Sequence, residues 1–291
     1  MQAPSPAPSG RISVGSHALA YELHGEASSD PTRLPVILVM GFSLPGRGWR
    51  FVWPALSADR LVLSFDNRGA GDSDKPRGPY AMSDFVADTL ALADRLGFAR
   101  FHLVGVSMGG MIAQHLALAA KHRVASLTLI ATQPGGVLAR IPRLQGIKTF
   151  VTANLTKDPT QRYLSISKML FPKAYIDTVG QQALLDVLKV DFEPHIPEHA
   201  RRAQLAAVFG HDARRRLGAL AGLPTLILKP ELDVLIHPKH SEALHRLIPG
   251  SRIKRIATAG HGLIRQMGPE VASMIGAHIA AAESNARPSR P

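Results

Sequence analysis

The sequence predicts an α/β fold built on a mostly parallel β-sheet, and three observations carry this prediction. Short apolar runs that are typical of buried strands recur along the chain, as at 35–40, 61–65 and 224–228. Segments with the apolar spacing of helices stand between several of these runs. The helix predicted from Ser83 to Leu96 lies between two strand patterns, and such a crossover connection makes the two strands parallel.

Composition sets the size and class of the protein. The chain has 291 residues, 45% of them hydrophobic, and a formal net charge of +12. This length is enough for one large domain, or for one domain with an insertion. The basic residues are dispersed, apart from Arg201-Arg202 and Arg214–Arg216, and few aromatic residues lie between them. We therefore interpret the charge as a solvated basic surface and expect no nucleic-acid partner. No apolar run approaches the roughly 18 residues of a membrane span.

Both ends of the chain have the composition of loose segments. Residues 1–10 are rich in Pro, Ser and Ala without a signal-peptide pattern, so they predict a disordered leader, and 284–291 predict a disordered tail. The chain contains no cysteine, which excludes disulfides, zinc–thiolate sites and a cysteine nucleophile. A cytoplasmic protein is expected.

A helical insertion divides the predicted sheet domain. Strand patterns stop after 133 and return at 219, and amphipathic segments separated by Pro and Gly fill 134–218. The predicted helices of this segment lie at 143–153, 161–171, 181–190 and 199–209. Because this stretch is much longer than an ordinary connection, we predict a helical cap at 134–218 and a core at 11–133 and 219–283.

The segment around Ser107 passes from a strand into a helix within a few residues. The apolar run that starts at Phe101 enters Gly105-Val106-Ser107-Met108-Gly109, and helical spacing follows at once. A bend this sharp strains the backbone, and Gly105 and Gly109 supply the room that it needs. Ser107 should therefore project from the edge of the sheet, next to the Met108 amide at the start of the helix.

This pattern resembles the nucleophile elbow of the α/β-hydrolase family. The turn at 66–73 resembles the family's Asp-x-Arg-Gly-x-Gly-x-Ser turn, which is structural there. The resemblance covers nearly the whole chain outside its ends. It implies an α/β-hydrolase fold, with a mostly parallel eight-stranded sheet flanked by helices and an inserted helical cap.

The resemblance also implies the partners of the serine, in the order Ser107, Asp233, His261. Asp233 follows the strand at 224–228, although Pro230 occupies the family's usual Gly position, and Glu231 is a reserve for the acid. His261 lies between two glycines after the last strand pattern, where a mobile catalytic imidazole is the favoured interpretation.

An oxyanion hole follows from the same resemblance. The strand at 35–40 ends at Gly41-Phe42, and in the family the residue after this Gly donates its backbone N–H to the oxyanion. Met40 stands where a His is common, but a backbone donor does not depend on that side chain. The Phe42 and Met108 amides are the predicted donors.

The predicted function is that of a serine hydrolase acting on a carboxylic ester or lactone of a small, fairly apolar substrate, without metal or organic cofactor. Aminopeptidases, C–C bond hydrolases and cofactor-free haloperoxidases or perhydrolases share these motifs, and the sequence leaves them open. A non-catalytic small-molecule receptor is the alternative of another class, but such a binder has no need for an intact Ser, His and Asp. The oligomeric state is also open.

Two further patterns suggest cofactors and are set aside. His195 and His199 match a zinc-peptidase string, but Pro197 between them interrupts the helix that would align them. Gly69-Ala70-Gly71 follows a strand as in dinucleotide-binding proteins, but the third glycine is missing and no helix starts there.

Overall fold

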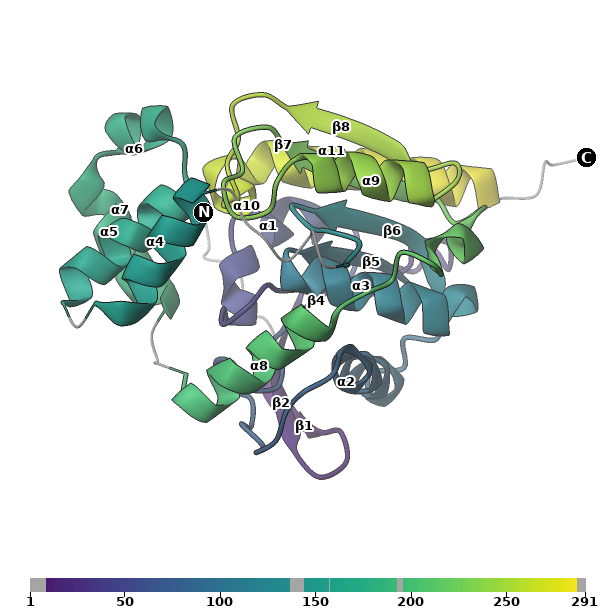
Figure 1. Ribbon diagram of the computed structural model, residues 1–291. Coiled ribbons are helices and arrows are strands. Elements are labelled where there is room, and N and C mark those ends of the chain that lie inside the picture. The colour runs from purple at the N-terminus through teal and green to yellow at the C-terminus, as the bar shows by residue number, and fades with distance from the viewer. Residues whose placement is uncertain (1–8, 137–143, 157, 193–195, 287–291) are drawn as a thin grey trace, which may run out of the picture.

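The computed structural model describes residues 9–136, 144–156, 158–192 and 196–286. Within these residues eight strands form one sheet in the order β1-β2-β4-β3-β5-β6-β7-β8 (Figure 1). β2 is antiparallel to both β1 and β4, and the remaining neighbours are parallel. The predicted fold class is thus confirmed. The strands are β1 (Ser9–Ser13), β2 (Ala18–His24), β3 (Val36–Val39), β4 (Val62–Phe65), β5 (Phe101–Val106), β6 (Val124–Ile130), β7 (Thr225–Pro230) and β8 (Arg252–Ile256).

Helices cover both faces of the sheet. The main helices of the core are α2 (Met82–Arg95), α3 (Met108–Ala119), α9 (Lys239–Leu247) and α11 (Gly268–Ala286), with the short helices α1 (Trp53–Leu56) and α10 (Leu263–Gln266). Successive residues of a strand point to opposite faces. Ile37 and Val39 of β3 therefore join the core cluster with α2, α3 and α9, while Val36 and Leu38 join the one with α1 and α11. Burial on both faces explains why these strands are apolar throughout.

The segment predicted as a cap contains five helices in its described part. They are α4 (Leu144–Leu155), α5 (Pro159–Leu170), α6 (Lys173–Val179), α7 (Gln181–Phe192) and α8 (Glu198–Gly210). Figure 1 shows α4 to α7 gathered beside the sheet domain, and α5 to α7 contribute most of a separate apolar cluster. α8 differs, because its Ala203 and Ala207 pack into the sheet core and the helix contacts α2. Within the segment predicted as the cap, this helix therefore packs on the sheet core.

The described structure extends further at both ends than the sequence predicts. β1 starts at Ser9, inside the predicted leader 1–10, because Ser9 and Gly10 pair with Glu22 and Tyr21 of β2. α11 continues to Ala286, inside the predicted tail 284–291. Residues 1–8 and 287–291, and Arg143 of the first predicted cap helix, lie outside the described residues. Among the described helices, none combines the length and apolar character needed to cross a membrane.

Candidate active site

Ser107 lies at the bend between β5 and α3. Its backbone has φ 54° and ψ −121°, a strained conformation for a residue with a side chain. A Cβ on Gly105 would lie 2.3 Å from the carbonyl oxygen of Gly109, and a Cβ on Gly109 would lie 2.0 Å from that of Val39. Neither position admits a side chain. The two glycines therefore permit the close approach of β3, β5 and α3 that creates the bend.

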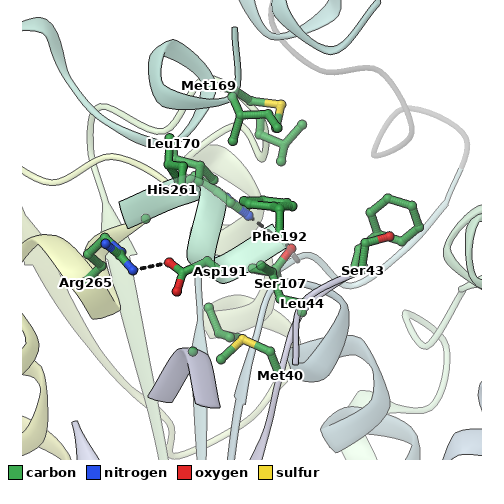
Figure 2. Close-up of a pocket in the computed structure, with 18 of the residues that line it drawn as sticks. Met40, Ser43, Leu44, Ser107, Met169, Leu170, Asp191, Phe192, His261 and Arg265 are labelled. Atoms are coloured by element: carbon green, nitrogen blue, oxygen red, sulfur yellow. Dashed lines mark hydrogen bonds and ion pairs between the residues drawn. The ribbon is translucent and has the colours of Figure 1, made fainter. Parts of the chain in front are cut away.

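Ser107, His261 and Asp233 form a hydrogen-bonded chain. His261 Nε2 lies 3.0 Å from Ser107 Oγ, and His261 Nδ1 lies 2.8 Å from Asp233 Oδ2 (Figure 2 shows the first of these contacts). The three residues follow β5, β8 and β7, whose carboxyl ends meet at one edge of the parallel sheet. The structure thus brings Ser107 together with His261, which is 154 residues away in the chain, and with Asp233, which is 28 residues from His261.

Asp233 is fully buried and is held by its own turn. Its Oδ1 accepts hydrogen bonds of 2.8 Å from the backbone N–H groups of Leu235 and Ile236, which leaves Oδ2 for His261. Pro230, at the family's usual Gly position, is the last residue of β7, where it pairs in register with Ile256 of β8. The proline therefore belongs to the strand, and the turn that carries Asp233 begins after it.

Glu231, the reserve acid, faces other partners. Its Oε1 lies 3.0 Å from Lys229 Nζ and 4.0 Å from Arg255 Nη1. Lys229 is buried and also contacts Glu242 at 2.6 Å, so Glu231 belongs to a charged cluster at the β7–β8 edge. The carboxylate that hydrogen-bonds His261 Nδ1 is that of Asp233 instead.

The loop around His261 packs against the cap segment, and the predicted mobility of the imidazole stays a prediction. His261 is only 7% exposed, and the Gly262 N–H donates a 2.8 Å hydrogen bond to the Leu170 carbonyl of the cap. A Cβ on Gly260 would lie 2.6 Å from the same carbonyl oxygen, and one on Gly262 would lie 2.6 Å from the Phe171 ring. The two glycines are needed because the cap chain passes directly over the histidine.

The loop after β3 lies beside the nucleophile and carries Phe42. A Cβ on Gly41 would lie 3.2 Å from Ser107 Cβ, so the start of this loop is in contact with the elbow. Asn67 Nδ2 donates a 2.9 Å hydrogen bond to the Met40 carbonyl, and Asp66 Oδ1 accepts one of 2.6 Å from the Gly46 N–H. Burial raises the pKa of Asp66, although its backbone hydrogen bonds from Asp72 and Gly46 oppose this rise. The turn at 66–73 therefore holds the loop after β3 through side-chain hydrogen bonds to its backbone.

Gln204 of α8 hydrogen-bonds the loop after β3 and the turn at 66–73, and the sequence did not indicate these contacts. Its Oε1 accepts a 2.9 Å hydrogen bond from the Ser43 N–H, and its Nε2 donates one of 2.8 Å to the Arg68 carbonyl. The side chain is completely buried. No local pattern marks such a residue, since its partners lie far away in the chain.

A cavity of about 160 Å³ opens above Ser107 and His261, between the core and the cap. Most of its wall is apolar, and the cap segment contributes Met169, Leu170, Phe171 and Leu188, of which Figure 2 labels the first two. Leu184 and Leu185 of α7 do not line the cavity and pack in the separate apolar cluster of the cap segment. The charged residues in the described wall are Arg162, Asp191, Arg201 and Arg265.

Other histidines lie apart from this cavity. His115, predicted as an ordinary helix-face residue, forms a 3.0 Å hydrogen bond with His211, which in turn contacts the Gln133 carbonyl at 3.0 Å. His199 of the zinc-like string contacts the Lys75 carbonyl at 3.1 Å, and its predicted companion His195 lies outside the described residues. Within the part of the chain that is described, no group of three metal-ligating side chains converges.

Comparison with known proteins identifies the class. The α/β-hydrolase fold family model matches residues 35–264, so the chain belongs to this family and is a hydrolase. The geometry above, with a strained serine between a strand and a helix, fits that class.

Individual relatives cover most of the chain. It is 29% identical over 288 residues to rhodomycin D methylesterase DnrP of Streptomyces peucetius, covering 89% of this chain and 95% of that protein. A solved thermophilic esterase from Thermogutta terrifontis is 25% identical with a TM-score of 0.77, covering 95% of this chain and 100% of that one. The chain is also 33% identical over 262 residues to the dihydrolipoyllysine-residue acetyltransferase component of the Pseudomonas putida acetoin cleaving system. That match covers 89% of this chain but spans only 66% of the relative's length.

Proposed function

We propose that this hydrolase cleaves a carboxylic ester or lactone of a small, fairly apolar substrate through an acyl-enzyme formed on Ser107. The observation that carries the proposal is the hydrogen-bonded chain from Ser107 through His261 to Asp233 at the floor of a mostly apolar cavity. A serine hydroxyl needs a base within hydrogen-bond reach to become a nucleophile at neutral pH, and His261 Nε2 lies at such a distance.

The proposed reaction has two halves. Ser107 Oγ attacks the carbonyl carbon while its proton passes to His261 Nε2, and the imidazolium then gives this proton to the departing alcohol oxygen. Water attacks the acyl-enzyme in the same way, so that the acid is released and Ser107 regains its proton. Asp233, fixed by two backbone N–H groups, holds the Nδ1 proton of His261 and stabilises the cationic ring.

The oxyanion of each tetrahedral intermediate needs donors that are already in place. The Met108 amide at the start of α3 and the Phe42 amide in the loop beside Ser107 are the proposed donors. Such a donor contributes about 3 kcal/mol to transition-state stabilisation, because it does not reorganise during the reaction.

Ester cleavage is proposed ahead of the other reactions of this fold for two reasons. Two of the relatives above are named as a methylesterase and an esterase. The cavity wall near Ser107 is also mostly apolar, which suits an uncharged acyl or alkoxy group. Amide cleavage, C–C bond cleavage and perhydrolysis are outcomes that a substrate screen would reveal.

The test combines covalent labelling with turnover. A fluorophosphonate probe and a series of p-nitrophenyl esters of increasing acyl length are applied to the native chain, to Ser107→Ala and to Ser83→Ala, which alters an exposed serine on α2. Labelling and ester turnover are expected for the native chain and Ser83→Ala, and both should vanish in Ser107→Ala. A folded native chain that neither labels nor turns over any ester would refute the proposal.

A further inference from the structure

An ion cluster links α7, α10 and the segment between β3 and α1 at the side of the same cavity. Asp191, near the end of α7, contacts Arg265 of α10 through Oδ2, and its Oδ1 lies 2.6 Å from Arg50 Nη2. Figure 2 shows the Asp191–Arg265 pair in the cavity together with Ser107 and His261. The side chains of Asp191 and Arg265 are only 9% and 11% exposed. The reaction proposed above uses none of these three residues.

The charges in this cluster do not balance. Asp191 is the acidic partner of both arginines, and neither Arg50 nor Arg265 has a second acidic partner in the described structure. The remaining contact that they share is the Phe51 ring, whose centroid lies 4.6 Å from one guanidinium and 4.7 Å from the other. Two guanidinium groups therefore share one carboxylate, which leaves one formal positive charge over.

Among the described residues, the cavity wall does not supply the missing negative charge. Asp191 is the one acidic residue in the described cavity wall, whereas Arg162 adds positive charge to it. The pKa of the Arg265 guanidinium is lowered, chiefly by burial, although Asp191 opposes this. A charge that is buried without a full counter-charge is costly, so an anion that entered the cavity would relieve this cost.

Arg265 is suited to receive such an anion. It lines the cavity, and its contact with Asp191 is made through Nη2, while a guanidinium has several N–H donors in one plane. A carboxylate matches this planar arrangement with its two oxygens.

We propose that the Arg50–Asp191–Arg265 cluster is a subsite for an anionic group of the substrate, so that the preferred ester carries a carboxylate away from the bond that is cleaved. The inference rests on the proposed function, since it assigns the substrate class of the same cavity. The uncharged part of the substrate lies along the apolar wall, and its carboxylate is held by Arg265. Asp191 keeps Arg265 in place, and Arg50 supplies the excess charge.

The experiment compares esters that differ in charge. Monomethyl esters of succinic, adipic and suberic acids are assayed against the matching dimethyl esters, and kcat/KM is obtained from methanol release. The chain-length series allows for the unknown span between Ser107 and the cluster. The native chain should prefer the monoanionic ester at one of these lengths. Arg265→Gln should lower this preference about 10- to 100-fold, because a charge-assisted hydrogen bond is lost.

Two further variants separate charge at the cluster from other effects. Arg50→Gln removes the excess charge without altering a residue of the cavity wall, so the preference for the monoanion should fall about 3- to 10-fold. Arg202→Gln makes the same change in net charge on α8, where the side chain is 75% exposed, and should leave the preference unchanged. Protection of the native chain from fluorophosphonate labelling by adipate, but not by adipamide, gives a readout that needs no variant.

The outcomes distinguish this inference from the proposed function. Turnover of neutral esters with no preference for the monoanion and no protection by adipate would overturn the subsite alone. An unchanged preference in a folded Arg265→Gln variant would also overturn it. Absence of both labelling and turnover would instead remove the serine-hydrolase proposal on which the subsite depends.

Discussion

The backbone N–H of Ser43 donates a 2.9 Å hydrogen bond to Gln204 Oε1, across 161 positions of the chain. Ser43 has φ 61°, a left-handed conformation that is unfavourable for a residue with a side chain. It follows Phe42, whose amide is a proposed oxyanion donor. Gln204 therefore helps to hold the loop that carries this amide beside Ser107.

We predict that Gln204→Ala lowers kcat about tenfold with little change in KM. The reason is that an oxyanion donor acts in the transition state and much less on the bound ester. Steady-state kinetics with the best p-nitrophenyl ester measure the effect, and Gln182→Ala, at an exposed position on α7, is the matched control. A fall in thermal stability with unchanged kcat would show that Gln204 is only structural.

Asp233 and Glu231 should respond differently to removal of their charge. Asp233→Asn leaves His261 in the wrong tautomer for accepting the Ser107 proton, so kcat should fall on the order of 10⁴-fold. Glu231→Gln should change kcat less than twofold, because Glu231 contacts Lys229 and Arg255. Ester turnover by the two purified variants is the measurement. The acid would have to be reassigned if Glu231→Gln were the more damaged variant.

Gly260→Ala should separate the cap from the histidine loop. The new Cβ would lie 2.6 Å from the Leu170 carbonyl oxygen and 2.8 Å from Pro172 Cδ, so the backbone of one partner must move. We expect kcat/KM to fall at least tenfold and the melting temperature to fall by several degrees. Gly218→Ala is the control, because nothing lies within 4 Å of its added Cβ. Equal behaviour of the two variants would contradict the contact.

Stability should fall on mild acidification. Burial lowers the pKa of His24 and of His211 from 6.5 to about 4, so both are neutral in the folded chain. The unfolded chain binds protons at these groups first, so their contribution is fully present above pH 6.5 and is lost as the pH falls towards 4. Urea unfolding at a series of pH values measures this slope.

His24→Phe tests the assignment of part of this slope. His24 stacks on Trp53 with ring centroids 3.9 Å apart, and phenylalanine keeps the stack but cannot titrate. The variant should therefore lose less stability than the native chain over the same pH interval. A slope identical to that of the native chain would rule out His24 as a contributor.

Much of the architecture could be predicted because it depends on local patterns. Strands buried on both faces need unbroken apolar runs, which are visible in the sequence. The bend at Ser107 needs glycine at 105 and 109, because a side chain at either position would collide with the backbone that lies against the bend. Ser107, Asp233 and His261 could be selected because the resemblance to the α/β-hydrolase family implies their order and each follows a strand pattern. Their catalytic roles stay a prediction until they are tested.

The sequence by itself thus determined the fold class, the strained serine and the order of its proposed partners. Only the tertiary structure decided that Gln204 braces the Phe42 loop, that the glycines around His261 admit the cap, and that Asp191 shares its charge between Arg50 and Arg265. These contacts join residues that are distant in the chain. Their strength depends on burial and on exact distances between side chains, and no local spacing of residue types encodes either quantity.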